Sequence, residues 1–172
     1  MNTPDENYVF HGSHELFDVV VPKRQIRKSL NKETGEYETV FDDISFHATP
    51  YKWIAIAYIC THNKFEREGF WYHYTKGVNL KEYEEAVEII GVDSMEESMK
   101  ELYGDGGYLY TYDKNEFHHA EGLGMLELIT KGSIHPIRVE RIDNPVAELK
   151  KLGIEFTFTD MTKDDFYKSN MH

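Results

Sequence analysis

The sequence predicts an α+β fold in which a single domain spans residues 1–172. The first observation is composition: 40% of the residues are hydrophobic and 14% are aromatic, with 12 Tyr and 10 Phe, which is typical of a globular protein with many strands. The second is that short β-prone runs alternate along the chain with segments that carry helix caps. No repeat, low-complexity tract or linker divides the chain, so we expect one core.

The N-terminal part predicts two short strands with loops around them. The run YVFHGS, residues 8–13, predicts a strand, and the apolar passage HELFDVVVP that follows it ends at Pro22, which cannot donate to a β-ladder. We expect a loop after Pro22 and a glycine-containing turn in NKETGEYETV, residues 31–40. The run DISFHATP predicts a second short strand that stops before Pro50.

Further strands and helices alternate through the rest of the chain. Strands are expected where aromatic or alternating apolar runs lie between turn residues: GFWYHYTKGV (69–78), GGYLYTYD (106–113), MLELITKG (125–132), SIHPIRVERID (133–143) and IEFTFTD (154–160). Helices are expected where caps or a wide apolar face mark a segment: PYKWIAIAYICTH (50–62), NLKEYEEAVEIIG (79–91), SMEESMKELYG (94–104) and NPVAELKKLG (144–153). The run EFHHAEGLG, residues 116–124, predicts a loop.

The charge balance of the chain favours some classes of partner over others. Thirty-one acids against 19 bases give a formal net charge of −12, which argues against a nucleic-acid partner held by broad electrostatics. Against this background, five bases cluster just after the first predicted strand: Lys23, Arg24, Arg27, Lys28 and Lys32. They fit either a solvated loop or a site for a small anion such as a diphosphate.

Cysteine and histidine usage excludes several kinds of site. The single cysteine, Cys60, lies in the apolar run WIAIAYIC, so we expect a buried inert thiol, no disulfide framework and a cytoplasmic protein. No segment approaches the length of a membrane span and the N-terminus shows no targeting signal, so no membrane partner is expected. Nine histidines leave a metal protein as an alternative, but His118 and His119 are adjacent and no HExxH or HxxxH spacing occurs, so we predict no metal.

Glu127 is an unusual acid in an apolar setting. It lies at the start of a predicted strand, and on strict alternation it shares a face with Met125 and Ile129, where an unpaired carboxylate is costly. Two interpretations stay open. The side chain is turned to solvent on an edge strand, or it is functional, with a raised pKa or a hydroxyl partner.

Three segments, in this order, resemble the ADP-ribosyltransferase superfamily, whose members cleave NAD at the nicotinamide–ribose bond and transfer ADP-ribose. YVFHGS resembles the first-strand His-Gly-Ser/Thr of the histidine-first branch, which includes poly(ADP-ribose) polymerase-like and rifampin ADP-ribosyltransferase-like proteins. DISFHATPYKWIAIAY resembles the second motif and its helix, and GLGMLELITKGSIHPIRV resembles the loop and strand that carry the glutamate. The resemblance spans residues 8–142, with a variable segment at 69–104, and implies a split antiparallel β-sheet core with flanking helices.

The resemblance also implies roles for individual residues. His11 would bond the adenosine ribose, and the backbone of Gly12, followed by Ser13, would bond the nicotinamide carboxamide, because a residue without Cβ lets a ligand approach. Glu127 would bond the ribose 2′-hydroxyl, stabilise the oxocarbenium-like transition state and orient or deprotonate the acceptor, so that it needs no buried cation. NAD is then the co-substrate. The remaining candidates are Arg24 or Arg27 for the pyrophosphate and an aromatic ring for the nicotinamide, chosen from Tyr51, Trp53 and Tyr58, for which core packing is the alternative.

The sequence departs from the family pattern at two places. Ser45 followed by Phe46 stands where the histidine-first branch has a tyrosine, and a serine there resembles the arginine-first class. Met125 stands two residues before Glu127, where arginine-modifying members have Glu or Gln, so the acceptor stays open: a protein side chain or small molecule is favoured over nucleic acid, and water is possible. A non-catalytic NAD- or ADP-ribose-binding module of the same fold is the alternative function.

Overall fold

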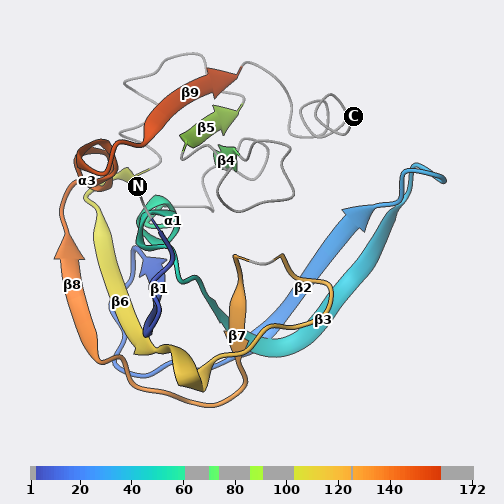
Figure 1. The fold of residues 1–172 in the computed structure, drawn as a ribbon, viewed down its shortest axis with the longest axis horizontal. Helices are drawn as coiled ribbons and strands as arrows, with labels where there is room; N and C mark the ends of the chain where they lie inside the picture. The colour runs from blue at the N-terminus through green and yellow to red at the C-terminus, as the bar shows by residue number, and fades with distance from the viewer. Residues whose placement is uncertain (1–2, 61–69, 74–85, 91–102, 125, 160–172) are drawn as a thin grey trace.

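The structure is a computed structural model that describes residues 3–60, 70–73, 86–90, 103–124 and 126–159. Figure 1 shows the order of the elements along the chain. The strands are β1 (Tyr8–Ser13), β2 (Lys23–Leu30), β3 (Tyr37–Ala48), β4 (Phe70–His73), β5 (Ala86–Ile90), β6 (Gly107–Asp113), β7 (Leu128–Thr130), β8 (Arg138–Ile142) and β9 (Glu155–Thr159). The helices are α1 (Lys52–Ala57), the 3₁₀ turn η3 (Lys114–Glu116) and α3 (Pro145–Lys151).

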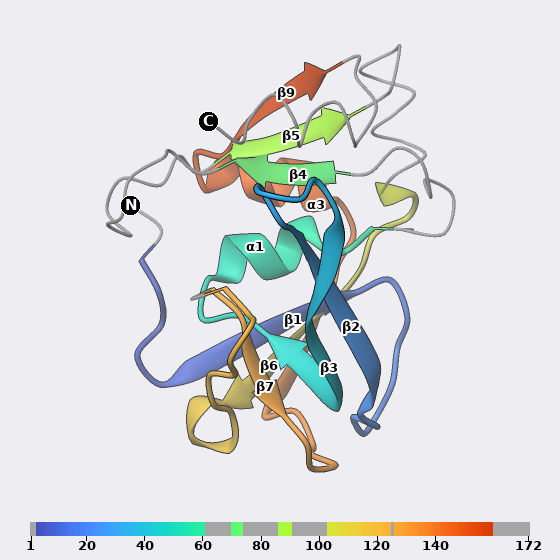
Figure 2. The same ribbon diagram turned by 90° about the vertical axis from the view of Figure 1, so that its right-hand side faces the viewer.

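Within the described residues, the strands form three sheets of three strands each. Two of them are antiparallel, with the orders β1-β6-β8 and β2-β3-β7. The third has the order β4-β5-β9 and is mixed, because β5 and β9 run parallel. Strands and short helices thus share one fold that is mostly β in the part of the chain that the structure describes. In the view of Figure 2, the β4-β5-β9 sheet lies on one side of α1, and β1, β6 and β7 lie on the other.

The residues after Pro22 form a strand, and the loop expected there is wrong. β2 pairs with β3 over its whole length, from Lys23 opposite Ser45 to Leu30 opposite Tyr37. The second strand was expected only over DISFHATP, but β3 begins earlier, at Tyr37. Its first half is polar, and pairing with the equally polar β2 makes it a strand. The register shifts between Arg27 and Lys28, and the hairpin projects from the body of the molecule (Figure 1).

Other sequence predictions have mixed outcomes. The strands expected in 8–13, 69–78, 106–113 and 154–160 are confirmed to within one residue over the part that the structure describes, whereas those expected in 125–132 and 133–143 are shorter, with β7 limited to Leu128–Thr130 and β8 to Arg138–Ile142. The helix expected over 144–153 is also confirmed: the side chain of Asn144 accepts a hydrogen bond from the Ala147 amide, and Pro145 occupies the first turn. The helix expected over 79–91 is wrong in its last turns, since Ala86–Ile90 is β5, and its start lies outside the described residues, as does most of the helix expected over 94–104.

Helix α1 is the apolar centre next to the pocket described below. All residues from Trp53 to Ala57 are buried, so the helix is apolar on every side rather than on one face. It packs against β1 and α3. Contact with β1 is very close at Gly12, where a Cβ atom would overlap the carbonyl oxygen of Ala55 and lie 2.9 Å from Cγ1 of Ile59. Only glycine lets the strand and the helix approach this closely.

The first strand also pairs with the end of β3. The amide of Phe10 donates to the carbonyl of Thr49 at 2.7 Å, and the amide of Thr49 donates back at 2.9 Å. These two bonds join the β1-β6-β8 sheet to the β2-β3-β7 sheet. As a result, His11 lies beside Phe46 and His47, two side chains from the other sheet.

No described helix is long and apolar enough to cross a bilayer.

Candidate functional site

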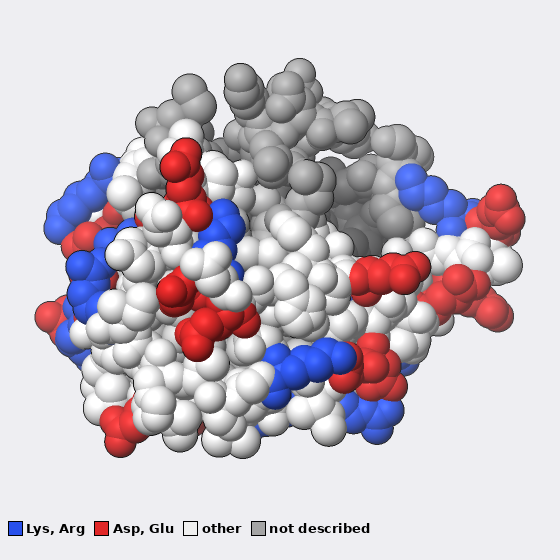
Figure 3. All heavy atoms as spheres, turned by 60° about the horizontal axis from the view of Figure 1, so that its bottom comes forward, with Lys and Arg blue, Asp and Glu red and all other residues white. Residues whose placement is uncertain are grey.

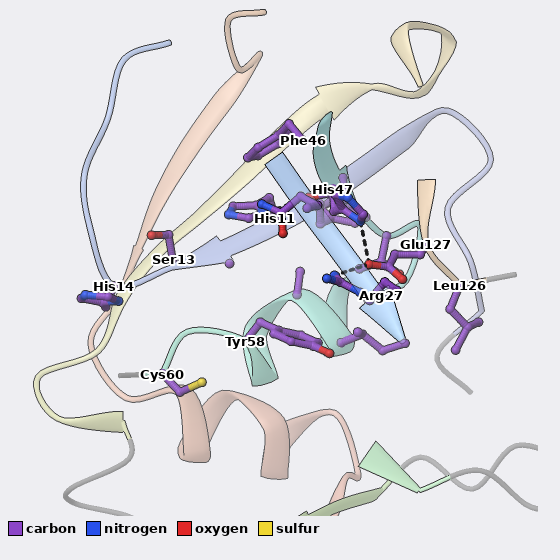
Figure 4. Close-up of a pocket in the computed structure, with 17 residues that line it drawn as sticks. His11, Ser13, His14, Arg27, Phe46, His47, Tyr58, Cys60, Leu126 and Glu127 are labelled. Atoms are coloured by element: carbon purple, nitrogen blue, oxygen red, sulfur yellow. Dashed lines mark hydrogen bonds and ion pairs between the residues drawn. The ribbon is translucent and has the colours of Figure 1, made fainter. Parts of the chain in front are cut away.

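A pocket of about 330 Å³ opens where the first two sheets and α1 meet (Figure 4). Strand β1 supplies His11, Gly12 and Ser13 to its lining. Other lining residues come from separate segments: Arg27 from β2, Phe46 from β3, Tyr58 from the end of α1, and Glu127 from the residue before β7. The structure therefore brings together one subset of the residues that the sequence singled out.

Two residues contact the same carboxylate oxygen of Glu127, Oε1. The Arg27 guanidinium donates to Oε1 at 2.8 Å, and Nδ1 of His47 lies 2.7 Å from the same atom. Both contacts are drawn in Figure 4. The Glu127 side chain is 31% exposed, so this ion pair is partly shielded from water.

The environment of Glu127 differs from both sequence-based interpretations. Burial raises the pKa of this carboxyl, but the hydrogen bond from His47 and the charge of Arg27 outweigh burial, so the pKa lies below its ordinary value. The expected raised pKa is therefore wrong, and so is the expectation that the carboxylate needs no cation. A side chain simply turned to solvent is wrong as well, because Glu127 lines the pocket in two specific contacts.

His47 is the residue of this site that the sequence analysis missed. Its side chain is 13% exposed, and its ring lies between Glu127 and Ser45, with Nε2 2.9 Å from the Ser45 hydroxyl. A signal was present in DISFHATP: Ser45 and His47 are two residues apart on one strand, so their side chains lie on the same face. That spacing lets a hydroxyl and an imidazole meet.

His11 enters the pocket as a neutral ring. Its Nδ1 lies 2.8 Å from the carbonyl oxygen of His47 and must carry the proton, because a carbonyl only accepts. Burial lowers the pKa of His11 to about 4, although the bond to His47 opposes this shift. At neutral pH Nε2 is therefore unprotonated, and it can accept a hydrogen bond from a ligand N–H or O–H.

This buried neutral histidine predicts a loss of stability in mild acid. Between pH 6.5, the ordinary pKa, and about 4, the unfolded chain binds a proton that folded His11 does not, so unfolding becomes easier as pH falls. At about 1.4 kcal/mol per pKa unit, the loss attributable to His11 is roughly 3 kcal/mol.

Urea unfolding between pH 7.5 and pH 4 measures this effect. The free energy of unfolding of His11→Gln should fall less steeply over this range than that of the wild type, and the exposed His135→Gln provides the matched control. Equal slopes for wild type and His11→Gln would show that His11 titrates normally in the folded protein.

Four of the predicted residues lie outside the pocket lining. Ser45, Tyr51 and Trp53 are buried at 1%, 7% and 2% exposure, and Trp53 and Tyr51 belong to the core around α1. Arg24 points away and forms a two-pronged ion pair with Asp42, at 2.8 and 2.7 Å. Of the three aromatic candidates, Tyr58 alone is at the pocket, and it is 37% exposed.

The Phe46 ring packs against His11, so its two faces are not both open to the pocket. The two ring centroids are 4.3 Å apart, and Phe46 also contacts Phe17, Tyr112 and Phe117 in the aromatic core. Phe46 therefore supports the His11 ring from the side. Cys60 is buried at the pocket wall, as expected, and burial raises the pKa of its thiol.

Both arginines of the base cluster are paired with acids within the protein. Arg24 pairs with Asp42 and Arg27 with Glu127, while Asp43 of β3 pairs with Lys131 from the residue after β7. Figure 3 shows basic and acidic side chains side by side at the end of the molecule where the β2–β3 hairpin lies. Four of the five bases lie on β2, Lys32 lies in the turn that follows it, and of the two arginines only Arg27 reaches the pocket.

The glycine of the first motif has a structural role that the sequence analysis did not foresee. Gly12 was expected to leave room for a ligand amide, but the space that its missing Cβ leaves is filled by α1. Gly12 still lines the pocket through its backbone.

Within the described residues, no group of three or more His, Cys, Asp or Glu side chains is arranged to hold a metal ion. Comparisons of the chain with protein-family models, with curated proteins and with solved structures return no match.

Proposed function

We propose that the protein is an NAD-dependent ADP-ribosyltransferase that cleaves the nicotinamide–ribose bond at this pocket. The observation that carries the proposal is the position of Glu127, a carboxylate distant in sequence from His11 and Gly12 that lines the same pocket. In this proposal, the β1-β6-β8 and β2-β3-β7 sheets are the two halves of an ADP-ribosyltransferase-like split sheet.

The polar groups at the pocket match a ligand rich in hydroxyls. Oε1 of Glu127 holds both Arg27 and His47, and no described residue donates to Oε2. Nε2 of His11 is a second acceptor, because its Nδ1 carries the proton. Two acceptors at one pocket favour a ligand that donates from two places, as the hydroxyls of the nicotinamide ribose do.

The charge of Glu127 suits the proposed reaction. Breaking the nicotinamide–ribose bond develops positive charge on the ribose, and a nearby fixed carboxylate stabilises that charge more in the transition state than in the ground state. The lowered pKa keeps the carboxylate ionised at neutral pH. Tyr58, an aromatic residue at the pocket, is the ring that we propose to contact the cationic nicotinamide, with a cation–π energy of about 0.5 to 2 kcal/mol.

The pocket volume limits how NAD would bind. A volume of about 330 Å³ is near the lower end of the range for small-molecule sites. The nicotinamide riboside end fits that space better than the whole dinucleotide, so we place this end inside and the adenylate toward the surface beyond Ser13 and His14, which line the pocket.

Arg27 is the residue proposed to contact the pyrophosphate, and Arg24 is its natural control. Arg27→Gln should weaken NAD binding by roughly tenfold, the value of a charge-assisted hydrogen bond, and should flatten its salt dependence. Arg24→Gln removes the same charge from the same strand but should leave the dissociation constant unchanged, since Arg24 binds Asp42 outside the pocket.

Calorimetric titration of NAD across a salt series measures both variants. Equal effects of the two substitutions would show that Arg27 acts only through the general charge of β2.

A binding module that does not cleave NAD is the second candidate, and one observation favours it. The Arg27 cation already pairs with Glu127 and offsets part of the charge that would stabilise the transition state. Incubation of the purified protein with NAD, with nicotinamide release and NAD binding measured together, separates the two candidates. Nicotinamide release supports the enzyme, and NAD binding without release supports the binding module. If neither release nor binding is detected, NAD is not the ligand of this pocket.

The acceptor is tested separately with labelled NAD and cell lysate. Label on protein, on a small molecule or on free ADP-ribose would identify a protein acceptor, a small-molecule acceptor or water. The net charge of −12 makes nucleic acid the least favoured acceptor.

A further inference from the structure

A chain of hydrogen bonds runs from the protein interior to Glu127. It begins at the buried Ser45 hydroxyl, 2.9 Å from Nε2 of His47, and continues from Nδ1 of His47 to Oε1 of Glu127 at 2.7 Å. Figure 4 shows the end of this chain, with His47 and Arg27 meeting the carboxylate from different sides. The rings of Phe41 and His47 also pack edge to face, with centroids 5.6 Å apart and an interplanar angle of 88°. The imidazole is therefore held by packing as well.

The direction of each hydrogen bond follows from the chemistry of the groups. An ionised carboxylate only accepts, so Nδ1 of His47 carries the proton. When the ring carries that one proton alone, Nε2 is an acceptor and the Ser45 hydroxyl donates to it. Ser45, which is 1% exposed, thus holds the plane of the imidazole from inside the protein and, in the neutral ring, its tautomer.

The arrangement determines which carboxylate oxygen is left for a ligand. Arg27 and His47 both bind Oε1, and among the described residues nothing binds Oε2. We propose that His47, with its ring fixed by Ser45, is a positioning residue that holds Glu127 by Oε1 so that Oε2 is presented to the substrate. The inference rests on the proposed function, because it assigns a purpose to this orientation.

The same geometry excludes Ser45 as a nucleophile. The order serine, histidine, carboxylate is that of a hydrolase triad. However, Ser45 is buried and does not line the pocket, so a substrate cannot reach its hydroxyl.

His47 also fixes the second proposed ligand group. Its backbone carbonyl accepts the Nδ1 proton of His11 at 2.8 Å, while its ring binds Glu127. One residue of β3 thus sets the positions of a histidine from one sheet and of a carboxylate from the other. Among the described residues, the ionisable groups facing Glu127 are Arg27 from β2 and His47 from β3, with His11 from β1 on the far side of His47.

The test compares two substitutions that differ in one hydrogen-bond donor. His47→Asn keeps an N–H near the position of Nδ1, whereas His47→Leu fills similar space without a donor; His135→Asn, at an exposed histidine, is the control. The ionisation of Glu127 is followed by carboxyl NMR, and nicotinamide release gives kcat and KM. The ring nitrogens of wild-type His47 are assigned by nitrogen NMR at neutral pH.

We expect the pKa of Glu127 to rise in His47→Leu, because burial still raises it and one of the two opposing groups is gone, and to stay near the wild-type value in His47→Asn. The kcat should fall roughly ten- to hundredfold in His47→Leu, as when a residue that orients a functional group is removed, and should largely recover in His47→Asn. KM for NAD should change little in either variant, because the contacts proposed for binding remain.

Three results would overturn the positioning role: an unchanged Glu127 titration in His47→Leu, the same rise in both variants, or a wild-type His47 ring protonated on Nε2 alone. The last measurement needs no variant and stands even if His47→Leu does not fold. Because the titration and the tautomer are measured without NAD, they decide the positioning role separately. Absence of nicotinamide release from the wild type would instead count against the proposed function.

Discussion

Glu127→Gln is expected to reduce nicotinamide release from saturating NAD by roughly two to four orders of magnitude, as for loss of a strong electrostatic or general-base group. Glutamine keeps the shape of the side chain and an oxygen that can accept from Arg27 and His47, so the pocket should keep its form. NAD affinity should change little, because the lost charge acts mainly on the transition state. Release assays and calorimetric binding on the same preparations measure the two effects.

Glu121→Gln is the matched control for this experiment. Glu121 is an exposed acid in the same loop, outside the pocket lining, so the change removes one unit of charge without touching the site. Release by the control should equal that of the wild type. If the Glu127→Gln protein releases nicotinamide at the wild-type rate, this carboxylate is not catalytic.

Gly12→Ala is expected to cost stability by about 3 kcal/mol or more, at the upper end of the range for overpacking a close contact. The added methyl group meets backbone, the carbonyl of Ala55, and a backbone oxygen cannot turn aside as a flexible side chain can. Strand β1 and helix α1 would have to separate. Urea unfolding, followed by the signal of the buried aromatic residues, gives the free energy of unfolding.

Gly124→Ala serves as the comparison for this prediction. A Cβ atom at Gly124 meets nothing within 4 Å, so its substitution should change the free energy of unfolding by well under the value for Gly12. If Gly12→Ala is as stable as Gly124→Ala but binds NAD poorly, then the glycine is required for ligand approach, as the sequence alone suggested, and not for the contact with α1.

Local chemistry in the sequence was enough to predict the elements that carry strong signals. The caps of α3, Asn144 and Pro145, and the alternating aromatic residues of β6 specify their elements within a few residues. The strand β2 was missed because its residues, KRQIRKSL, are polar on both faces, and what makes it a strand is pairing with β3 rather than burial. The segment Ala86–Ile90 carries a helical pattern upstream, yet its pairing with β4 and β9 prevails.

The candidate site was predictable in part of its members and not in its contacts. His11, Gly12 and Glu127 could be selected because a motif order marks them, and the structure places them at one pocket. The pairing of Glu127 with Arg27 could not be predicted, because it depends on the β2–β3 hairpin crossing to the start of β7. The burial of Trp53 and Tyr51 likewise depends on how α1 is enclosed, which apolar spacing does not specify.

The register shift between Arg27 and Lys28 divides the hairpin into two parts that can change independently. Arg27 lies opposite Phe41 and Lys28 opposite Thr39, so one extra residue of β3 is accommodated at that point. On the side of the shift nearer the pocket, pairing of β3 with β7 sets which face of the strands points to the pocket. On the side nearer the hairpin turn, β2 and β3 contact mainly each other. Because the shift already accommodates one extra residue, a change in the length of the outer arm need not turn Arg27 away from Glu127. The outer arm is therefore the part of the hairpin where an insertion should disturb the pocket least.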